Sequence, residues 1–399
     1  MSQALEFAEA RRIVIETVRQ LARPLKTETV ALAEAHGRIL AKALHADRDY
    51  PALERSLRDG YAVKAKDVPG TLKVGGEVRA GDLEQPPLRD GEAFEIMTGA
   101  PVPAGADAVV MVEHATRSGD RVQIQQTAEA GQFINRRGAE AAAGALLVDA
   151  HTKLDASHVA ALAAAGWTLV PVFAKPLVAI LATGDEIVAL EDQPAPHQIR
   201  NSNSYMLAAL VRASGGEPTI LPVAHDTKEE LLPLLKTGMG CDLLIVTGGV
   251  SAGKYDLVKP ALRELGAEFR FERVRIQPGQ PTAFGVANGK PLFGLPGNPG
   301  SSLITFQLFA QPVLEMLAGV RDPILPLLSA RFAAPFRHKG GLTRFLPAWL
   351  SEDGMQLRHI SWQGSSDVPA LAKANCFLVA DHDRESWAVG DSIRVMLKL

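Results

Sequence analysis

The sequence predicts a multidomain protein of the α/β and β classes, with a central, mostly parallel α/β module, an inserted small β domain and a C-terminal small β domain. Three observations predict it. The chain has 399 residues, more than one hydrophobic core usually supports. Apolar strand-like runs alternate with helical segments from residue 174 to about 322, a pattern typical of a parallel sheet. Short apolar runs separated by Gly and Pro turns occupy residues 51–137 and 327–399.

The composition narrows the class of protein. Hydrophobic residues make up 47% and charged residues 22% of the chain, which is ordinary for globular domains and excludes disordered and fibrous proteins. The formal net charge of −3 gives no general attraction to nucleic acids or anionic membranes, so we expect neither partner. Two cysteines cannot form a disulfide framework, which favours a reducing compartment; we expect a cytoplasmic protein.

The N-terminal residues predict a discontinuous first domain. Residues 1 to about 45 carry apolar side chains at helical spacing, and the charges among them exclude a signal peptide. The pattern changes at Asp49-Tyr50-Pro51, and a helical segment returns near residues 157–165. We therefore assign residues 1–50 and 138–173 to one domain, with residues 51–137 inserted as a β-rich domain.

The α/β module is expected at residues 174–322 and the C-terminal β domain at 323–399. The predicted strands cover 177–181, 219–224 and 243–246, and the predicted helices cover 204–213, 228–236 and 257–265. Ser202 or Asn203 is the expected N-cap of the first of these helices, and Gly215 and Gly266 are expected to end helices. Asn288-Gly289 predicts a hairpin turn.

The segments that follow the predicted strands are the candidate binding loops, because open parallel sheets bind ligands beyond the carboxyl ends of their strands. They are Thr183-Gly184-Asp185-Glu186, His225-Asp226, the glycine-rich run 247–253, and Pro296-Gly297-Asn298-Pro299-Gly300. Two glycine-rich loops and several carboxylates are thus predicted to meet at one edge of the sheet.

The glycine-rich run has the composition of a phosphate-binding loop. Glycines leave backbone N–H groups uncovered, and a helix is expected to begin near Asp256. The alternative is an ordinary turn. Gly248, Gly253 and Lys254 fit the Walker spacing, but Tyr255 stands where Ser or Thr must bind magnesium, so we reject a nucleotide triphosphatase.

The other candidates have equally clear alternatives. The small residues of 296–302 leave room for an anion at a helix N-terminus, or serve only for capping and tight packing. Glu186, Asp226 and Asp256 supply the hard oxygen ligands that Mg²⁺ prefers, or are caps and solvated acids. In the N-terminal half, residues 56–62 and 97–110 have the irregular composition of shaped loops, and Arg136-Arg137 offers paired guanidiniums to an oxyanion or to solvent.

Five motifs occur together in order. They are Ser-x-x-Asp-Gly-Tyr-Ala at 56–62, Met-Thr-Gly-Ala-Pro-x-Pro at 97–103, Thr-Gly-Asp-Glu at 183–186, Thr-Gly-Gly-Val-Ser at 247–251 and Leu-Pro-Gly-Asn-Pro at 295–299. With them the chain resembles the molybdopterin molybdenumtransferase (MoeA) family, and is similar to the E domain of gephyrin. The resemblance implies an L-shaped homodimer of four-domain subunits whose central module binds molybdopterin. It also implies an enzyme that inserts molybdate into adenylylated molybdopterin, with Mg²⁺-dependent release of AMP.

The resemblance also implies the site residues. The catalytic group would be Asp59, Thr98, Glu140, Glu186, Asp226, Asp256 and Arg273, of which Glu186, Asp226 and Asp256 would hold Mg²⁺. The phosphate-bearing ligand would contact Gly248, Gly249, Ser251, Gly253, Pro296, Gly297, Asn298 and Pro299.

Several residues depart from the family pattern. The family stretch Lys-Pro-Gly-Lys-Pro is replaced by Gln277-Pro278-Gly279-Gln280-Pro281, which removes two ammonium groups. Glu140 and Asn201 replace usual aspartates, Pro347 stands where an arginine is frequent, and Arg273 stands where lysine is frequent. A molybdopterin adenylyltransferase is an expected partner that would deliver the substrate. The alternatives are that the chain is itself such an adenylyltransferase, or a non-catalytic carrier or scaffold.

Overall fold

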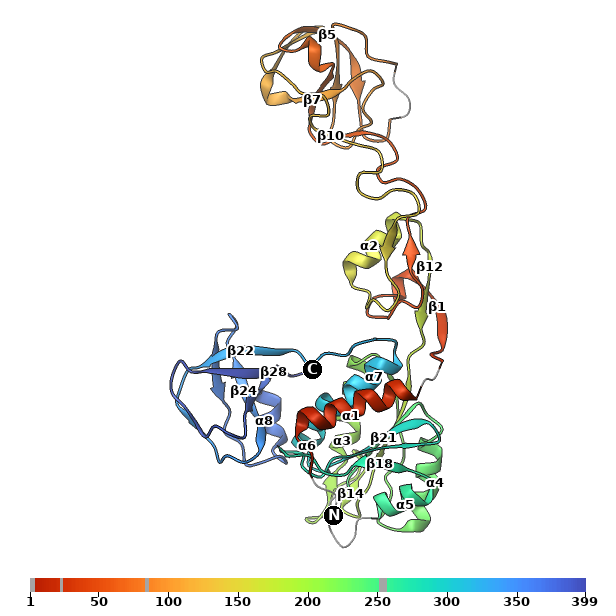
Figure 1. Ribbon diagram of the computed structural model, residues 1–399, viewed down its shortest axis with the longest axis vertical. Helices are drawn as coiled ribbons and strands as arrows, with labels where there is room; N and C mark the ends of the chain where they lie inside the picture. The colour runs from red at the N-terminus through yellow and green to blue at the C-terminus, as the bar shows by residue number, and fades with distance from the viewer. Residues whose placement is uncertain (1–3, 22–23, 83–85, 251–256) are drawn as a thin grey trace. The chain divides into compact units, whose positions relative to one another are not determined.

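The computed structural model describes residues 4–21, 24–82, 86–250 and 257–399. The chain forms two compact units (Figure 1). The first comprises Met1–Thr29, Gly37–Ala41 and Pro171–Leu399, and the second comprises Val30–His36 and Lys42–Val170. None of the described helices is long and apolar enough to cross a membrane.

A six-stranded sheet forms the centre of the first unit. Its order is β16 (Glu217–Ile220), β13 (Leu177–Ala182), β17 (Leu243–Thr247), β21 (Lys290–Leu295), β20 (Ala283–Ala287) and β18 (Glu268–Phe271). The first four strands are parallel, whereas β20 and β18 are antiparallel to their neighbours. Asn288 and Gly289 have φ of 51° and 70° in the turn between β20 and β21, which confirms the predicted hairpin. The mostly parallel α/β module is therefore confirmed.

Helices cover both faces of this sheet. Val178 and Ile180 pack in a core with α1 (Phe7–Gln20), α3 (Ser202–Ala213), α6 (Pro299–Thr305) and α7 (Gln311–Leu317). Ala179 and Leu181 face the opposite core, with α4 (Lys228–Gly238) and α5 (Val258–Glu264). The alternation follows from the strand period of two and explains why β13 and β17 read as continuous apolar runs. A π-helical segment, Phe306–Ala310, joins α6 to α7.

The C-terminal residues form the predicted small β domain. Its sheet runs β19 (Ile276–Gln277), β24 (Thr343–Leu350), β25 (Gln356–His359), β22 (Leu327–Phe332), β28 (Ser392–Leu397) and β26 (Cys376–Ala380), and a β24–β26 pairing closes the last five strands into a ring. Helix α8 (Val368–Lys373) and a ribbon of β23 (Phe336–Arg337) with β27 (Ser386–Trp387) complete it. Phe345, Phe377 and Val379 belong to the same core as the α1 face of the central sheet.

The second unit contains the predicted β-rich domain. Its six-stranded sheet has the order β7 (Ala108–Met111), β4 (Gly60–Val63), β6 (Glu92–Ile96), β5 (Gly70–Val78), β9 (Arg121–Ile124) and β8 (Ala115–Ser118). Short antiparallel pairs also join β2 (Leu44–His45) to β11 (Leu146–Val148) and β3 (Arg55–Ser56) to β10 (Ile134–Asn135). Helix α2 (Ala156–Ala164) begins with a capping box in which Asp155 and His158 exchange hydrogen bonds, and it confirms the predicted helical segment.

Three local predictions were wrong. Residues 1–45 are helical only in α1, because Thr27–Ala31 forms β1, which pairs with β12 (Leu169–Phe173), and Leu44–His45 forms β2. The strand predicted at 219–224 lies at Glu217–Ile220, where its register is fixed by pairing with β13. The N-cap of α3 is Asn201, whose Oδ1 accepts from the Ser204 backbone N at 3.1 Å.

Candidate active site

A cavity of about 360 Å³ lies at the carboxyl ends of the parallel strands in the first unit. The loops that follow β13, β17 and β21 line it, together with a ribbon of β14 (Ile187–Val188) and β15 (Ile199–Arg200) and the start of α3. The sequence-predicted residues that it brings together are Glu186, Asp226, Gly248, Gly249, Pro296, Gly297, Asn298 and Pro299. The geometric reason is that parallel strands end at the same edge of a sheet.

The turn after β17 requires glycine. Gly248 and Gly249 have φ of 92° and 59°, in the region that side chains disfavour. A Cβ on Gly248 would lie 2.4 Å from the Thr183 carbonyl oxygen, and one on Gly249 would lie 2.7 Å from Val258 Cγ2. The two glycines thus allow the loops after β13 and β17 to approach each other. Ser251, Gly253 and Asp256 lie outside the described residues, so the rest of the predicted loop is not placed.

Side chains join the cavity loops into one network. Asn203 Nδ2 donates to Thr247 Oγ1 at 3.0 Å and to the Gly297 carbonyl at 2.6 Å, and Thr247 Oγ1 donates to the Pro296 carbonyl at 3.2 Å. Among the described residues, the buried atoms Thr183 Oγ1 and Asn203 Oδ1 have no hydrogen-bond partner. Asn203 had been predicted only as a possible cap; its link to two strand ends depends on tertiary contacts that its sequence position does not reveal.

Two carboxylates that line the cavity, Glu186 and Asp226, lie near a third, that of Asp185. Asp185 Oδ1 accepts from the Asp226 backbone N at 3.0 Å and lies 3.3 Å from His225 Nδ1. Burial, and then the negative charges of Asp185 and Glu186, raise the pKa of Asp226 above its usual value. A carboxyl group whose ionisation is disfavoured by burial and by neighbouring negative charge fits a bound cation, and carboxylate oxygens are the ligands that Mg²⁺ prefers.

The described carboxylates do not make a complete metal site. Within the described ranges, no three His, Cys, Asp or Glu side chains are grouped so as to hold a metal ion. Glu186 and Asp226, two of the three predicted ligands, line the cavity, while Asp256 lies outside the described residues. The two described carboxylates supply the type of oxygen donor that Mg²⁺ prefers, but they do not complete a site by themselves.

Two more cavity residues carry functional groups. Asn298 is the N-cap of α6, but its Nδ2 donates to Ser365 Oγ at 3.0 Å and its side chain makes no capping bond. Arg200 of β15, which sequence reasoning did not single out, also lines the cavity. The sequence around Arg200 contains no signal for a site, because a single arginine outside any motif is usually solvated.

Arg273, Gln277 and Gln280 do not line the cavity. The Arg273 carbonyl accepts from the Leu5 backbone N at 3.2 Å, and Arg273 is not among the residues that line the cavity. Gln277 is exposed on β19, where it pairs in register with Arg344 of β24. Pro281 is the residue of the 277–281 stretch that lines the cavity.

Asp59, Thr98 and Glu140 belong to the second unit. Asp59 Oδ1 accepts from the Thr98 backbone N at 2.6 Å and from Thr98 Oγ1 at 2.9 Å, and these hydrogen bonds lower the pKa of Asp59. Glu140 Oε1 accepts from Asn135 Nδ2 at 2.7 Å. The structure therefore brings Asp59 and Thr98 together and gives Glu140 a separate partner.

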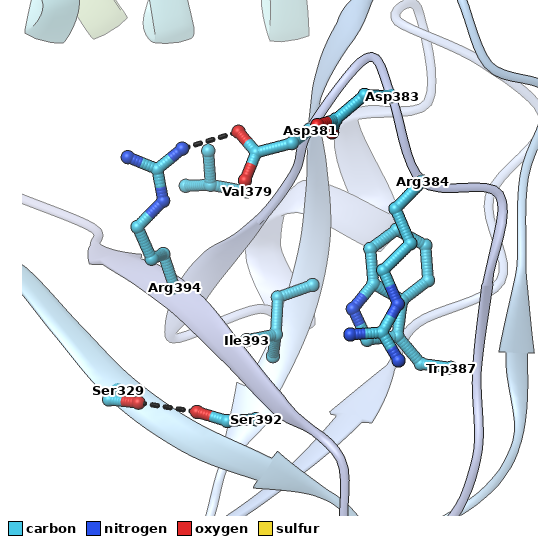
Figure 2. A pocket seen from close by; sticks show the side chains of 9 residues that line it. All are labelled: Ser329, Val379, Asp381, Asp383, Arg384, Trp387, Ser392, Ile393 and Arg394. Atoms are coloured by element: carbon cyan, nitrogen blue, oxygen red, sulfur yellow. Dashed lines mark hydrogen bonds and ion pairs between the residues drawn. The ribbon is translucent and has the colours of Figure 1, made fainter.

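A second cavity, of about 560 Å³, lies in the C-terminal β domain (Figure 2). Both arginines of its lining have acidic partners: Arg394 pairs with Asp381, and Arg384 pairs with Asp391 and lies over the Trp387 ring at 4.9 Å. Ser329 and Ser392 share a hydrogen bond of 2.7 Å. Because these groups satisfy one another, and none was predicted as a site residue, the cavity of the central sheet is the stronger candidate.

Models of known protein families match most of the chain. Residues 5–166 match the MoeA N-terminal region (domain I and II), residues 179–316 match a probable molybdopterin binding domain, and residues 329–398 match the MoeA C-terminal region (domain IV). The central match contains the strand-end loops of the candidate site.

Curated relatives and solved structures agree with these matches. A molybdopterin molybdenumtransferase from a Nostoc species is 39% identical over 77% of this chain and 73% of its own. Molybdopterin molybdenumtransferase 2 from Mycobacterium tuberculosis is 34% identical over 97% of this chain and 98% of its own. The crystal structure of a molybdopterin biosynthesis MoeA protein from Pyrococcus horikoshii has a TM-score of 0.84 at 28% identity, with 99% of this chain and 100% of that chain covered.

Proposed function

The chain belongs to the MoeA family of molybdenum cofactor biosynthesis, and from this membership we propose that it inserts molybdate into adenylylated molybdopterin with Mg²⁺-dependent release of AMP. The single observation that supports this activity best is the cavity of the central sheet. One cavity contains a glycine turn suited to phosphate and two carboxylates suited to a divalent cation.

Each part of the cavity has a task in the proposed reaction. The turn at Gly248 and Gly249 carries no side chain, and because the Gly248 backbone N donates to the Leu295 carbonyl at 3.2 Å, the Gly249 backbone N is the amide that binds a phosphate of the adenylate. Asn203 holds the loops after β17 and β21 together and keeps the phosphate-binding wall in one shape. Pro296, Gly297, Asn298 and Pro299, which follow the neighbouring strand β21, form the adjoining part of the lining.

Glu186 and Asp226 are the proposed Mg²⁺ ligands among the described residues, with Asp256 as the third by resemblance. Mg²⁺ at these ligands would neutralise charge on the phosphate oxygens as the adenylate is cleaved. Asp185 accepts the Asp226 backbone N–H, which fixes the start of the loop that carries Asp226. Arg273 is proposed to supply positive charge near the site, although its side chain is outside the cavity lining.

The test is incubation of the purified protein with molybdopterin adenylate, Mg²⁺ and molybdate, followed by measurement of AMP and of active cofactor. Molybdate-dependent AMP release is the expected result. If the protein instead forms the adenylate from ATP and molybdopterin, it is an adenylyltransferase. If it binds the adenylate without releasing AMP, it is a carrier.

We further propose a cytoplasmic homodimer that receives its substrate from a molybdopterin adenylyltransferase. Family membership supports the dimer, and the two cysteines, of which Cys376 is buried with its pKa raised to about 11, are consistent with a reducing compartment. In this dimer the loops with Asp59, Thr98 and Glu140 would complete the partner's cavity. Cross-linking and sedimentation measurements test the dimer directly.

A further inference from the structure

We propose that Arg200 binds a tetrahedral oxyanion of the substrate, either molybdate or a phosphate of the adenylate. The proposal rests on the function proposed above and assigns a specificity residue to the same cavity. Arg200 ends β15, directly before the Asn201 cap of α3, and it is one of the residues that line the cavity.

The charges of the cavity make a cation necessary. The charged side chains among the described lining residues are those of Glu186, Asp226 and Arg200, so two negative charges face a single positive one. Both proposed substrates are anions, and their binding next to two carboxylates is unfavourable unless positive charge lies nearby. Gln277 and Gln280 are uncharged, and Arg273 does not line the cavity. Arg200 is therefore the arginine that the described lining offers to an anion.

The backbone holds Arg200 on the same ribbon as Glu186. Strands β14 and β15 pair in register at Val188 and Arg200. The Ile199 backbone N donates to the Glu186 carbonyl at 2.8 Å, and the Asn201 backbone N donates to the Val188 carbonyl at 2.9 Å. Arg200 and Glu186 therefore belong to the two segments of one paired ribbon, and both residues line the cavity.

The hydrogen bonds of Arg200 orient its side chain and leave its charge available. Nε donates to the carbonyl oxygens of Leu190 at 3.0 Å and Asp192 at 3.2 Å. Within the described part of the chain, no acidic side chain forms an ion pair with Arg200. The two terminal nitrogens therefore keep their donors, and a guanidinium fork matches the spacing of oxygens on a tetrahedral anion.

The test compares Arg200→Gln, which removes the charge, with Arg200→Lys, which keeps the charge and loses the fork. Arg212→Gln on the exposed surface of α3 is the control for a general change of net charge. Two quantities separate the possible anions: the molybdate concentration that gives half-maximal AMP release, and the dissociation constant of AMP measured by calorimetry. Circular dichroism melting curves show whether each variant is folded.

We expect Arg200→Gln to weaken either molybdate binding or AMP binding by about tenfold or more, which is the loss typical of a charge-assisted hydrogen bond. Arg200→Lys should weaken the same binding by a smaller factor. A higher half-maximal molybdate concentration identifies molybdate as the anion that Arg200 binds. A higher dissociation constant for AMP identifies the phosphate instead. Added salt should weaken that binding more in the wild type than in Arg200→Gln, because the charge is absent from the variant.

Three results would overturn the inference. One is unchanged molybdate dependence and AMP binding in folded Arg200→Gln, and a second is an equal effect of Arg212→Gln. The third is an equal loss in Arg200→Gln and Arg200→Lys with unchanged salt sensitivity, which would show that Arg200 only braces the loop at Leu190 and Asp192. If Arg200→Gln does not fold, the same comparison is made between Arg200→Lys and the wild type: weaker anion binding with changed salt sensitivity supports the inference, and unchanged binding contradicts it. Absence of AMP release by the wild type would contradict the proposed function, whereas AMP binding would still test Arg200.

Discussion

Asn203 Nδ2 lies 2.6 Å from the carbonyl oxygen of Gly297 and so ties the first turn of α3 to the loop after β21. The same amide donates to Thr247 Oγ1 at the end of β17. One side chain thus fixes two of the loops that form the cavity, and the positions of the proposed phosphate contacts depend on it.

Asn203→Ala should therefore loosen the cavity. We expect a loss of about 1–3 kcal/mol in the free energy of unfolding, because two hydrogen bonds are lost and Thr247 keeps only part of its pairing. The Michaelis constant for the adenylate should rise more than kcat falls, since the residue positions binding loops. Urea unfolding and steady-state kinetics measure both. Unchanged stability and kinetics would show that Thr247 and Ser302 hold the loops without Asn203.

Gly248→Ala tests the glycine turn, with Gly266→Ala as a matched control. Both glycines have positive φ, 92° and 87°, but a Cβ at Gly266 meets nothing within 4 Å, whereas one at Gly248 would lie 2.4 Å from the Thr183 carbonyl oxygen. Gly266→Ala should cost about 1–2 kcal/mol for the backbone conformation alone. Gly248→Ala should cost a further ~1–3 kcal/mol from crowding and should abolish AMP release. Equal costs in the two variants would mean that the loop moves aside freely.

Asp226→Asn should stabilise the protein while removing its activity. Burial and the charges of Asp185 and Glu186 raise the pKa of Asp226, so its ionisation destabilises the folded state. This penalty is absent below the unfolded pKa, grows as the pH rises toward the folded pKa, and is fully present above the folded pKa. We therefore expect a higher melting temperature for Asp226→Asn at pH 7 without Mg²⁺, and little difference near pH 3.

Magnesium provides the second half of this test. Added Mg²⁺ should raise the melting temperature of the wild type and much less that of Asp226→Asn, because a ligand that binds only the folded state stabilises it. Asp383→Asn in the C-terminal β domain is the control for a lost surface charge. A lower melting temperature of Asp226→Asn at pH 7, or full activity, would contradict the assignment of Asp226 to the cation site.

The sequence could predict the elements of this site better than its contacts. The loops after β13, β17 and β21 could be predicted because apolar strand runs and glycine turns are visible in the local sequence. Parallel strands then bring the ends of these strands to one edge of the sheet. Arg200 and the two bonds of Asn203 were not foreseeable, because they depend on the register of β14 with β15 and on loops almost 100 residues apart. The misplaced cap of α3 has a similar cause: Asn201, Ser202 and Asn203 all have capping side chains, and only the pairing of β15 places the helix start.

Gln277→Lys should lower the amount of molybdate that the enzyme requires, if the missing ammonium group attracts the anion. Gln277 is exposed on β19, four residues before Pro281 of the cavity wall, so the added charge would act through space and not by direct contact. The effect should be visible at low ionic strength and disappear near 1 M salt, because the Debye length is then only about 3 Å. Half-saturating molybdate is the measurement. No change at low salt would show that the position is too remote or that Arg200 already supplies the charge.

The last prediction concerns how complete sites are assembled. The cavity of the first unit contains the glycine turn, Glu186 and Asp226, whereas Asp59 and Thr98 form a hydrogen-bonded pair in the second unit. If each active site combines the cavity of one subunit with the Asp59 loop of its partner, a two-fold symmetric dimer has two equivalent sites. Asp226→Ala and Asp59→Asn proteins would each be inactive alone.

Co-expression of these two variants with different affinity tags should restore activity in the purified heterodimer. A heterodimer has one site with both mutations and one with neither, so about half of the wild-type activity per dimer is expected from the symmetry of two sites. A dimer of two Asp226→Ala chains is the negative control. A dimer of Asp383→Asn with Asp59→Asn is the positive control, because one of its two sites has an intact cavity and an intact Asp59. An inactive heterodimer, verified by both tags and by its mass, would establish that each site is built within a single chain.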